Sequence, residues 1–355
     1  MFDYESFYKG KRVLLTGHTG FKGSWMLAAL HKFGAKVLGY SLAPNTTPSM
    51  FEKIGGDKLC TSVIGDISDY DKLLKAFTDF QPEIVIHMAA QPIVLESYKA
   101  PVWTYQTNVM GTVNVLEAVR HTKSVRSFVN VTTDKVYENL SLTRGYVETD
   151  ALGGYDPYSN SKACSELVTK AYRSSFFNPE KYAEHGVSIS TCRAGNVLGG
   201  GDWADNRLIP DCVRYSLKGE PIIIRNPKAV RPWEHVMEPV FQYLKLAALQ
   251  YDNVAYAGHY NIGPEVSHCK PVLDILQLFV KYFPGATYEI HENPNAPHEA
   301  SLLMLNIDKS KEVLGFRPRY SADDTIRVSV EWYTADARGE DMLSVTLQQI
   351  EDFLQ

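Results

Sequence analysis

Short apolar runs alternate with amphipathic segments through the first half of the chain. The runs have the length and β-branched content of buried strands, and they occupy residues 12–16, 36–40, 61–64, 84–87 and 127–132. Helical periodicity fills intervals at about residues 21–33, 70–80 and 101–121. This alternation predicts right-handed βαβ units and hence an α/β fold, a doubly wound parallel sheet of the Rossmann type with helices on both faces.

The pattern loosens after a further strand that we predict at residues 187–193. Gly, Pro and Asn become frequent, and helices are expected near residues 236–250, 271–283 and 322–337. We therefore predict a dinucleotide-binding domain over residues 1–190 and a smaller C-terminal α/β lobe over residues 191–355, with crossings between the two. A cleft between two lobes is the usual place for a ligand.

Composition and charge narrow the classes of partner. The 355 residues carry 36 Lys and Arg against 41 Asp and Glu, so the net charge is −5. The chain therefore offers no strongly basic surface for nucleic acid.

The five cysteines are widely spaced and form no CxxC pair, as expected for a protein of a reducing compartment. Neither a signal peptide nor an apolar run of membrane-spanning length is evident. We expect a soluble cytoplasmic protein that binds no nucleic acid and no membrane. Without HExxH or a Cys/His cluster, we expect no metal.

A glycine-rich turn follows the first predicted strand and opens the first helix. Its GxxGxxG spacing lets backbone N–H groups approach a pyrophosphate, while the helix N-terminus supplies partial positive charge. A purely structural turn is the alternative, but the strand–turn–helix context favours a dinucleotide. The predicted cofactor-binding residues of this turn are Gly17, Thr19, Gly20, Phe21, Lys22 and Gly23.

The end of the second strand bears on the choice of dinucleotide. The acidic residue expected there for the ribose is missing, and no Lys or Arg is present for a 2′-phosphate, so we favour NAD over NADP. Asp66 and Ile67 follow the third strand and are placed to contact the adenine. The alternative for Asp66 is a helix cap, for which Asp69 is the better candidate.

Tyr158 and Lys162 are four residues apart, on one face of a predicted helix that starts at Pro157. A tyrosine with an ordinary pKa of about 10 is a poor base, but a nearby ammonium and a cationic nicotinamide favour its phenolate. The spacing alone occurs by chance in many helices. It gains weight from the glycine turn and from Thr133, a hydroxyl at the carboxyl end of the fifth strand, where doubly wound sheets bind ligands.

Together these motifs resemble the extended short-chain dehydrogenase/reductase family, over nearly the whole chain. The matching segments are GxxGxxG, His87–Gln91 (HMAAQ), Asn108–Ala118 (NVMGTVNVLEA), TTDK and YSNSK. The resemblance implies NAD as cofactor. It adds to the cofactor-binding set the residues Ala89, Ala90, Gln91, Asn108, Tyr158 and Lys162.

Within that family, Thr133-Asp134 is similar to the nucleotide-sugar 4,6-dehydratases, which carry Thr-Asp-Glu, whereas the epimerases usually carry small residues there. This chain departs from the pattern by having Lys135 in place of Glu. Two longer segments, Thr133–Asn139 (TDKVYEN) and Arg231–Val236 (RPWEHV), narrow the resemblance to one member of the group.

The resemblance implies a redox-neutral dehydration of a nucleotide sugar, which feeds deoxysugar synthesis for bacterial surface polysaccharides. Tyr158 would take the proton of the 4-hydroxyl, Lys162 would hold the cofactor ribose, and Thr133 would orient the 4-oxygen. Asp134 and Lys135 would form the acid–base pair that removes water, and which of them is the acid stays open. We expect general acid–base assistance of this kind to contribute about 10²–10⁴-fold to the rate.

A sugar nucleotide carries two phosphates, so cations and amides are needed to hold it. The candidates are Arg193, Asn196, Arg207 and Arg231, and for any single arginine a solvated surface charge is the alternative. The helices at residues 101–121 and 157–177 are expected to build a homodimer or a dimer of dimers, as in the family, unless their apolar stripes only pack on the sheet. A 4-epimerase or reductase, and a non-catalytic dinucleotide sensor, remain the alternative functions.

Overall fold

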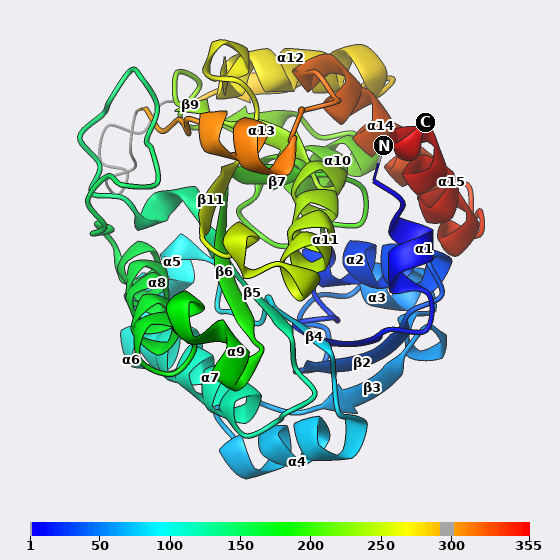
Figure 1. Ribbon diagram of the computed structural model, residues 1–355. Helices are drawn as coiled ribbons and strands as arrows, with labels where there is room; N and C mark the ends of the chain where they lie inside the picture. The colour runs from blue at the N-terminus through cyan, green and yellow to red at the C-terminus, as the bar shows by residue number, and fades with distance from the viewer. Residues whose placement is uncertain (1, 292–301) are drawn as a thin grey trace.

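The computed structural model describes residues 2–291 and 302–355. Its centre is a seven-stranded parallel sheet, which confirms the predicted fold class (Figure 1). From one edge to the other the strands are β11 (His259–Ile262), β6 (Ser188–Ala194), β5 (Ser127–Thr133), β4 (Ile84–His87), β1 (Arg12–Thr16), β2 (Lys36–Ser41) and β3 (Thr61–Ile64). The predicted strands are present with shifts of one residue at most, because each is a short apolar run bounded by turn residues.

Alternate residues of the strands face two separate apolar cores, because successive side chains of a strand point to opposite faces of the sheet. Val13 and Leu15 pack on α2 (Phe21–Lys32) and α11 (Met237–Asp252) on one face. Leu14 packs on α4 (Tyr70–Phe80) and α7 (Gly111–Arg120) on the other. The long helix α8 (Pro157–Ser175) contacts β5, β6, α6 and α7. The sheet is therefore covered on both faces, and in such sheets ligands bind outside the carboxyl ends of the strands.

One helix expected at residues 101–121 is divided in the structure. It consists of α6 (Pro101–Tyr105), a π-helical turn (Gln106–Met110) and α7, which follow one another without a break. The π turn contains the buried Asn108, and such turns are frequent at functional sites.

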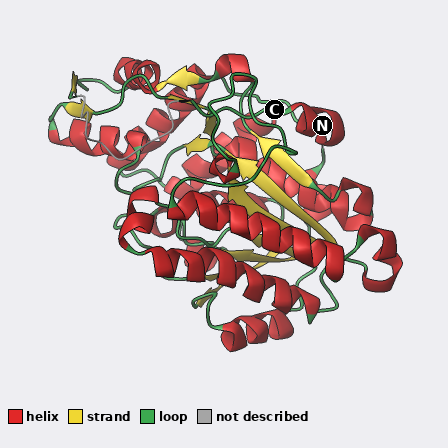
Figure 2. Ribbon diagram, turned by 90° about the vertical axis from the view of Figure 1, so that its left-hand side faces the viewer, coloured by secondary structure: helices red, strands yellow, loops and turns green. Residues whose placement is uncertain are grey.

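The second half of the chain contributes to both lobes. The strand β11 and the helix α11 complete the central sheet and one of its faces, although both lie beyond residue 190. The smaller lobe contains α10 (Leu208–Lys218), α12 (Val272–Tyr282), α13 (Asp308–Leu314) and α14 (Ala322–Ala337) (Figures 1 and 2). The remaining helices are α1 (Tyr4–Tyr8), α3 (Met50–Lys53), α5 (Val94–Lys99), α9 (Tyr182–His185) and α15 (Met342–Leu354).

Three two-stranded sheets lie outside the central one. They are β7 (Asn196–Leu198) with β10 (Trp233–His235), β9 (Val230–Arg231) with β12 (Lys270–Pro271), and β8 (Ile222–Ile224) with β13 (Tyr288–Ile290). The strand β7 begins two residues after the end of β6, and β10 pairs with it in parallel, so residues 233–235 lie beside the segment that continues from the carboxyl end of β6. Over the described ranges, no helix is long and apolar enough to cross a bilayer.

Candidate active site

The glycine turn between β1 and α2 is held closed by contacts that a side chain would prevent. Gly17 has a φ of +78°, and a Cβ there would lie 2.8 Å from the amide nitrogen of Ala89. A Cβ on Gly23 would lie 2.0 Å from the carbonyl oxygen of Gly17. Gly20 is the N-cap of α2 and offers no capping side chain, so the positive end of the helix is left for an anion. The turn fits the pyrophosphate of a dinucleotide.

The end of β2 is lined by neutral hydrogen-bonding groups. The hydroxyl of Thr19 donates to the carbonyl of Leu42 (2.8 Å) and lies 2.9 Å from the Ser41 hydroxyl. The ring of His18 packs on Gly39, where a Cβ would lie 2.3 Å from it, and its Nε2 lies 2.8 Å from the Ser62 hydroxyl. Burial lowers the pKa of His18 to about 4, so the ring is neutral. These groups suit a ribose hydroxyl better than a 2′-phosphate. The sequence pattern alone assigns no role to His18.

Asn108 and Gln91 join the loop after β4 to α8. The amide of Asn108 donates to the Gln91 carbonyl (3.0 Å) and the Ser161 hydroxyl (2.8 Å), and its oxygen accepts from the Gln91 N–H (2.8 Å). The side chain of Gln91 donates to Thr104 (2.9 Å) and accepts from the N–H of Ile93 (2.6 Å). Both side chains are used within the protein, so they support the loop that contains Ala89 and Ala90.

Asp66 and Ile67 form the turn between β3 and α4. A carboxylate oxygen of Asp66 accepts from the N–H of Ser68 (2.8 Å), and the buried Ile67 packs on Gly111. The cap of α4 is Asp69, as the sequence indicated, so the cap does not account for Asp66.

Tyr158 and Lys162 lie on the first turns of α8, which Asp156 caps by accepting from the N–H of Ser159. Burial raises the pKa of Tyr158 to about 12, while a hydrogen bond with Thr133 opposes the rise. The ammonium of Lys162 donates to the carbonyl of Val131 (2.8 Å). Burial, with a smaller effect of the Lys22 charge, lowers the pKa of Lys162 to about 8. In this state the phenol is protonated and needs additional positive charge to ionise near neutral pH.

A short 3₁₀ turn, Asp134–Val136, brings three consecutive side chains together at the end of β5. Oδ1 of Asp134 accepts from the Thr133 hydroxyl (3.0 Å) and from the Lys135 ammonium (2.9 Å). Lys135 also reaches Oδ1 of Asn196, 3.4 Å away on β7. Asp134 is fully buried, and its Oδ2 has no hydrogen-bond partner among the described residues. The pair combines a buried carboxyl and an ammonium in direct contact.

Arg193 does not fit the substrate-binding role predicted for it. Its guanidinium donates to Glu166 through Nε (3.0 Å) and Nη2 (2.9 Å) and to the Tyr137 hydroxyl (2.8 Å). Both Arg193 and Glu166 are buried, with 2% and 1% of the side chain exposed. Glu166 also accepts from the hydroxyls of Thr132 and Thr191. The arginine fork is therefore used to fix α8 against β5 and β6, below the site.

The other predicted anchors lie around the acid–base pair and in the smaller lobe. Arg207 is the N-cap of α10, donates to Asp202 (3.0 Å), and is close enough for its charge to lower the pKa of Tyr158. Asn196 contacts Lys135, as described above. Arg231 is buried in β9 and donates to the carbonyl of Val230 (2.9 Å).

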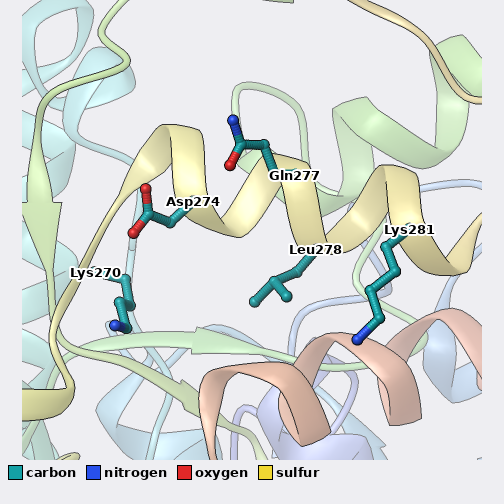
Figure 3. Close-up of a pocket in the computed structure, with 5 residues that line it drawn as sticks. All are labelled: Lys270, Asp274, Gln277, Leu278 and Lys281. Atoms are coloured by element: carbon teal, nitrogen blue, oxygen red, sulfur yellow. The ribbon is translucent and has the colours of Figure 1, made fainter.

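A surface hollow of about 390 Å³ lies along α12, and its lining residue Lys270 is the strand partner of Arg231 (Figure 3). It is lined by Lys270, Asp274, Gln277, Leu278 and Lys281, none of which belongs to the predicted site. In the part of the chain that the structure describes, no group of three or more His, Cys, Asp and Glu side chains could hold a metal.

The fold and the site define a dinucleotide-dependent enzyme of nucleotide sugars. The chain belongs to the GDP-mannose 4,6 dehydratase family, whose sequence model matches residues 14–328. The chain is 46% identical to the CDP-glucose 4,6-dehydratase of Salmonella typhimurium over 351 residues, which cover 99% of this chain and 98% of that protein. It is 28% identical to a dTDP-glucose 4,6-dehydratase of Xanthomonas campestris, over 90% and 92% of the two chains.

Solved structures show the same fold. The dTDP-glucose 4,6-dehydratase of Bacillus anthracis in complex with NAD superposes with a TM-score of 0.76 at 22% identity, over 94% of this chain and 100% of that one. The UDP-glucose 4-epimerase of Thermus thermophilus in complex with NAD gives 0.76 at 25% identity, over 90% and 98% of the chains. The prediction of a sugar-nucleotide dehydratase is confirmed by the family match and by the 46% identity to a CDP-glucose 4,6-dehydratase.

Proposed function

We propose that this enzyme is a hydro-lyase that converts CDP-glucose to CDP-4-keto-6-deoxyglucose with bound NAD. The observation that carries the proposal is the full-length similarity to a CDP-glucose 4,6-dehydratase, together with the Asp134–Lys135 pair at the end of β5. An epimerase has no water to remove and no need of such a pair. The substrate base rests on the similarity, since no described contact identifies a cytosine.

The protein's own residues fit NAD. The glycine turn would receive the pyrophosphate, Ser41 and Thr19 would face the adenosine ribose, and Lys162 would hold the second ribose. Bound NAD would supply the oxidant, accepting a hydride from C4 of the sugar and returning it to C6. No external reductant is then consumed.

Tyr158 would remove the proton of the sugar 4-hydroxyl, and the Thr133 hydroxyl would orient that oxygen. Because burial keeps the pKa of Tyr158 at about 12 in the ligand-free protein, ionisation requires added positive charge. The charge of Arg207 already lowers this pKa, and the cationic cofactor would supply the further charge. Proton removal would therefore await assembly of the complete site.

The elimination can be written for the Asp134–Lys135 pair with protons balanced. Transfer of one proton along their 2.9 Å hydrogen bond converts ammonium and carboxylate into a neutral amine and a carboxylic acid. The amine of Lys135 would take the C5 proton, which the 4-ketone acidifies. Asp134 would give its proton to the C6 hydroxyl, which leaves as water. The pair returns to ammonium and carboxylate, ready for the next cycle.

Three further residues would hold the substrate and position the pair. Arg207 and Arg231 would bind the phosphates, and Asn196 would contact the sugar or pyrophosphate beside Lys135.

We also propose that the protein is a homodimer, or a dimer of dimers, built on the outer face of α6 and α8. The apolar side chains of Val102, Trp103 and Met110 are 70%, 42% and 52% exposed, and Leu167 on α8 is 53% exposed. Large apolar side chains gathered on adjacent helices mark an interaction surface.

Five free cysteines and no described disulfide suit a cytoplasmic location. The product of the proposed reaction would feed the synthesis of the 3,6-dideoxyhexoses of bacterial O-antigens.

The decisive experiment is incubation of the purified enzyme with CDP-glucose, dTDP-glucose and GDP-mannose, with NAD and without reductant. A 4-keto-6-deoxy product develops near-ultraviolet absorbance in alkali. We expect product from CDP-glucose alone. Product only from another nucleotide sugar would reassign the substrate, and interconversion of 4-epimers without that absorbance would indicate an epimerase. No change in any sugar would favour a non-catalytic sensor.

A further inference from the structure

The segment that carries the acid–base pair is followed by a buried tyrosine whose hydroxyl takes part in two hydrogen bonds. Tyr137 directly follows the 3₁₀ turn Asp134–Val136 and has 2% of its surface exposed. Its hydroxyl donates to Oδ1 of Asn261 on β11 (2.6 Å) and accepts from Nη1 of Arg193 on β6 (2.8 Å). The guanidinium carbon of Arg193 also lies 5.0 Å from the centre of the tyrosine ring. The proposed mechanism does not use this tyrosine.

Arg193 connects this tyrosine to α8, the helix that holds Tyr158 and Lys162. Its Nε and Nη2 donate to the two carboxylate oxygens of Glu166 (3.0 and 2.9 Å). Glu166 follows Lys162 by four residues, about one helical turn, so the two side chains leave α8 on the same side. A planar guanidinium bound at both oxygens has a fixed geometry. The position of the helix therefore determines where the tyrosine hydroxyl is held.

The same carboxylate also attaches the chain on the other side of the turn. Thr132 lies on β5 and donates through its hydroxyl to Oε1 of Glu166 (2.5 Å). Glu166 therefore holds the end of β5 directly through Thr132, and it holds Tyr137 through Arg193. Residues 133–136, which include the acid–base pair, lie between these two attachments to one side chain of α8.

Backbone hydrogen bonds fix the general course of the same segment. The carbonyl of Val136 accepts from the N–H of Gly153 (2.8 Å), and the N–H of Glu138 donates to the carbonyl of Ala151 (2.9 Å). Neither bond involves the Tyr137 hydroxyl. Removal of that hydroxyl should therefore displace the segment without unfolding it.

We propose that this chain of contacts sets the position of the Asp134–Lys135 pair relative to Tyr158. Oxidation at C4 and removal of water act on the same bound sugar, so the residues for the two steps need a fixed spacing. Tyr137 is then a positioning residue, which acts through the turn that precedes it. The inference rests on the proposed function, because that function assigns oxidation to Tyr158 and the removal of water to the pair.

The test is Tyr137→Phe, which removes the hydroxyl and keeps the ring that stacks on Tyr146, with 5.0 Å between the ring centres. Single-turnover mixing of the NAD-loaded enzyme with CDP-glucose separates the two steps. The absorbance of the reduced nicotinamide reports oxidation at C4, and uptake of solvent deuterium at C5 reports the removal of water. We expect oxidation to stay within about twofold of the wild-type rate, whereas deuterium uptake should fall by roughly 10-fold to 10²-fold, the loss that a misplacement of about 1 Å produces.

A second measurement needs neither substrate nor cofactor. Hydrogen exchange of the nucleotide-free protein, measured by mass spectrometry, reports how firmly the segment is held. In Tyr137→Phe the peptide that spans residues 133–138 should exchange faster than in the wild type. Peptides from the far edge of the sheet, such as residues 36–41, should exchange as before.

Tyr8→Phe is the matched control. Tyr8 on α1 is also fully buried, and its hydroxyl donates to the carbonyl of Leu244 (2.7 Å), outside the site. Its loss should lower the melting temperature and leave both steps and the exchange of residues 133–138 unchanged. Thr132→Val removes the other attachment to Glu166 and should reproduce the selective loss of water removal. It also provides the test if Tyr137→Phe does not fold.

Three results would overturn the inference: both steps unchanged in Tyr137→Phe, both steps slowed equally, or hydrogen exchange of residues 133–138 that matches the wild type. A wild type that forms neither reduced cofactor nor product from any nucleotide sugar would overturn the proposed function instead. In that event the hydrogen-exchange comparison still decides whether the hydroxyl holds the segment.

Discussion

Lys135 donates a hydrogen bond of 2.9 Å to Asp134, its own neighbour in the chain. Consecutive residues in an extended strand point to opposite faces, so this contact exists only because β5 ends in a 3₁₀ turn at Asp134. The carboxyl is fully buried, whereas 26% of the lysine side chain is exposed. The exposed part of the lysine side chain therefore marks the side from which a ligand would approach the pair.

Replacing either member of this pair should stop the removal of water. Lys135→Met should slow the exchange of the C5 hydrogen with solvent deuterium by about 10²–10⁴-fold, because no amine is left to remove it. Asp134→Asn should lower both the exchange and the product, because Lys135 has no carboxylate to take its proton and the C6 hydroxyl has no acid. Mass spectrometry of the recovered sugar measures both. Undiminished C5 exchange in Lys135→Met would exclude the lysine as base.

The glycine turn should tolerate a methyl group at one position and not at another. Gly17→Ala should reduce NAD affinity by more than tenfold, because φ is +78° and the new Cβ would lie 2.8 Å from the Ala89 nitrogen. Gly20→Ala is the matched control, since its nearest contact would be the Gly17 oxygen at 3.4 Å. Calorimetry with NAD measures both. Equal losses in the two variants would contradict a role for the close approach at Gly17.

Arg193 should matter for stability and little for substrate affinity. Arg193→Met leaves the Glu166 carboxylate buried without its ion pair, which should cost about 3–5 kcal/mol of unfolding free energy. Replacing both, with Arg193→Met and Glu166→Leu, should restore much of it. Urea unfolding measures the stability, and the KM for the nucleotide sugar supplies the second readout. A large rise in KM in a well-folded variant would return Arg193 to the substrate site.

Acid should destabilise the protein through its buried histidines. Burial lowers the pKa of His87 to about 3, with the charge of Lys162 adding to the effect, and burial lowers the pKa of His235 to about 3 and of His18 to about 4. The unfolded chain takes up these protons near the ordinary value of about 6.5, and the folded chain does not. The three neutral histidines therefore contribute fully to the free energy of unfolding above about pH 6.5, and this contribution is lost as the pH falls toward their pKa values in the folded protein.

One such histidine should lower the free energy of unfolding by about 1.4 kcal/mol for each pH unit below about 6.5. His87 lies 2.7 Å from the Thr16 hydroxyl and 3.2 Å from that of Thr112. His87→Gln should lower the melting temperature at neutral pH and flatten its decline in acid. Differential scanning calorimetry across the range measures this. Parallel declines in both proteins would show that His87 is not responsible.

We expect the subunits to associate through the exposed face of α6 and α8. Val102→Glu places a charge where 70% of an apolar side chain is exposed, and it should shift the protein toward monomer. Leu217→Glu on α10, where 55% is exposed, is the control and should leave the mass unchanged. Light scattering coupled to size exclusion measures the mass. A wild-type protein that is already monomeric would contradict the proposed dimer.

Local patterns were sufficient for most of the fold. The limits of β1, β3, β4, α4 and α14 are those that the sequence predicts, since apolar periodicity and turn residues act over a few positions. The glycine turn and the Tyr158–Lys162 spacing could be identified for the same reason. The division of the helix at residues 101–121 could not, because the π turn depends on the contacts of Asn108 with Gln91 and Ser161.

The sequence by itself determined a parallel α/β sheet, a dinucleotide turn and the residue types of a dehydratase. Tertiary structure decided which charges meet. The sequence pattern predicts Arg193 as a phosphate anchor, whereas the fold places Glu166 against its guanidinium. Lys135 likewise meets Asn196 only because β7 lies beside the end of β5 in the fold, 61 residues further along the chain. Local periodicity reports the backbone of each segment, whereas charge pairing depends on distances between segments that only the folded chain defines.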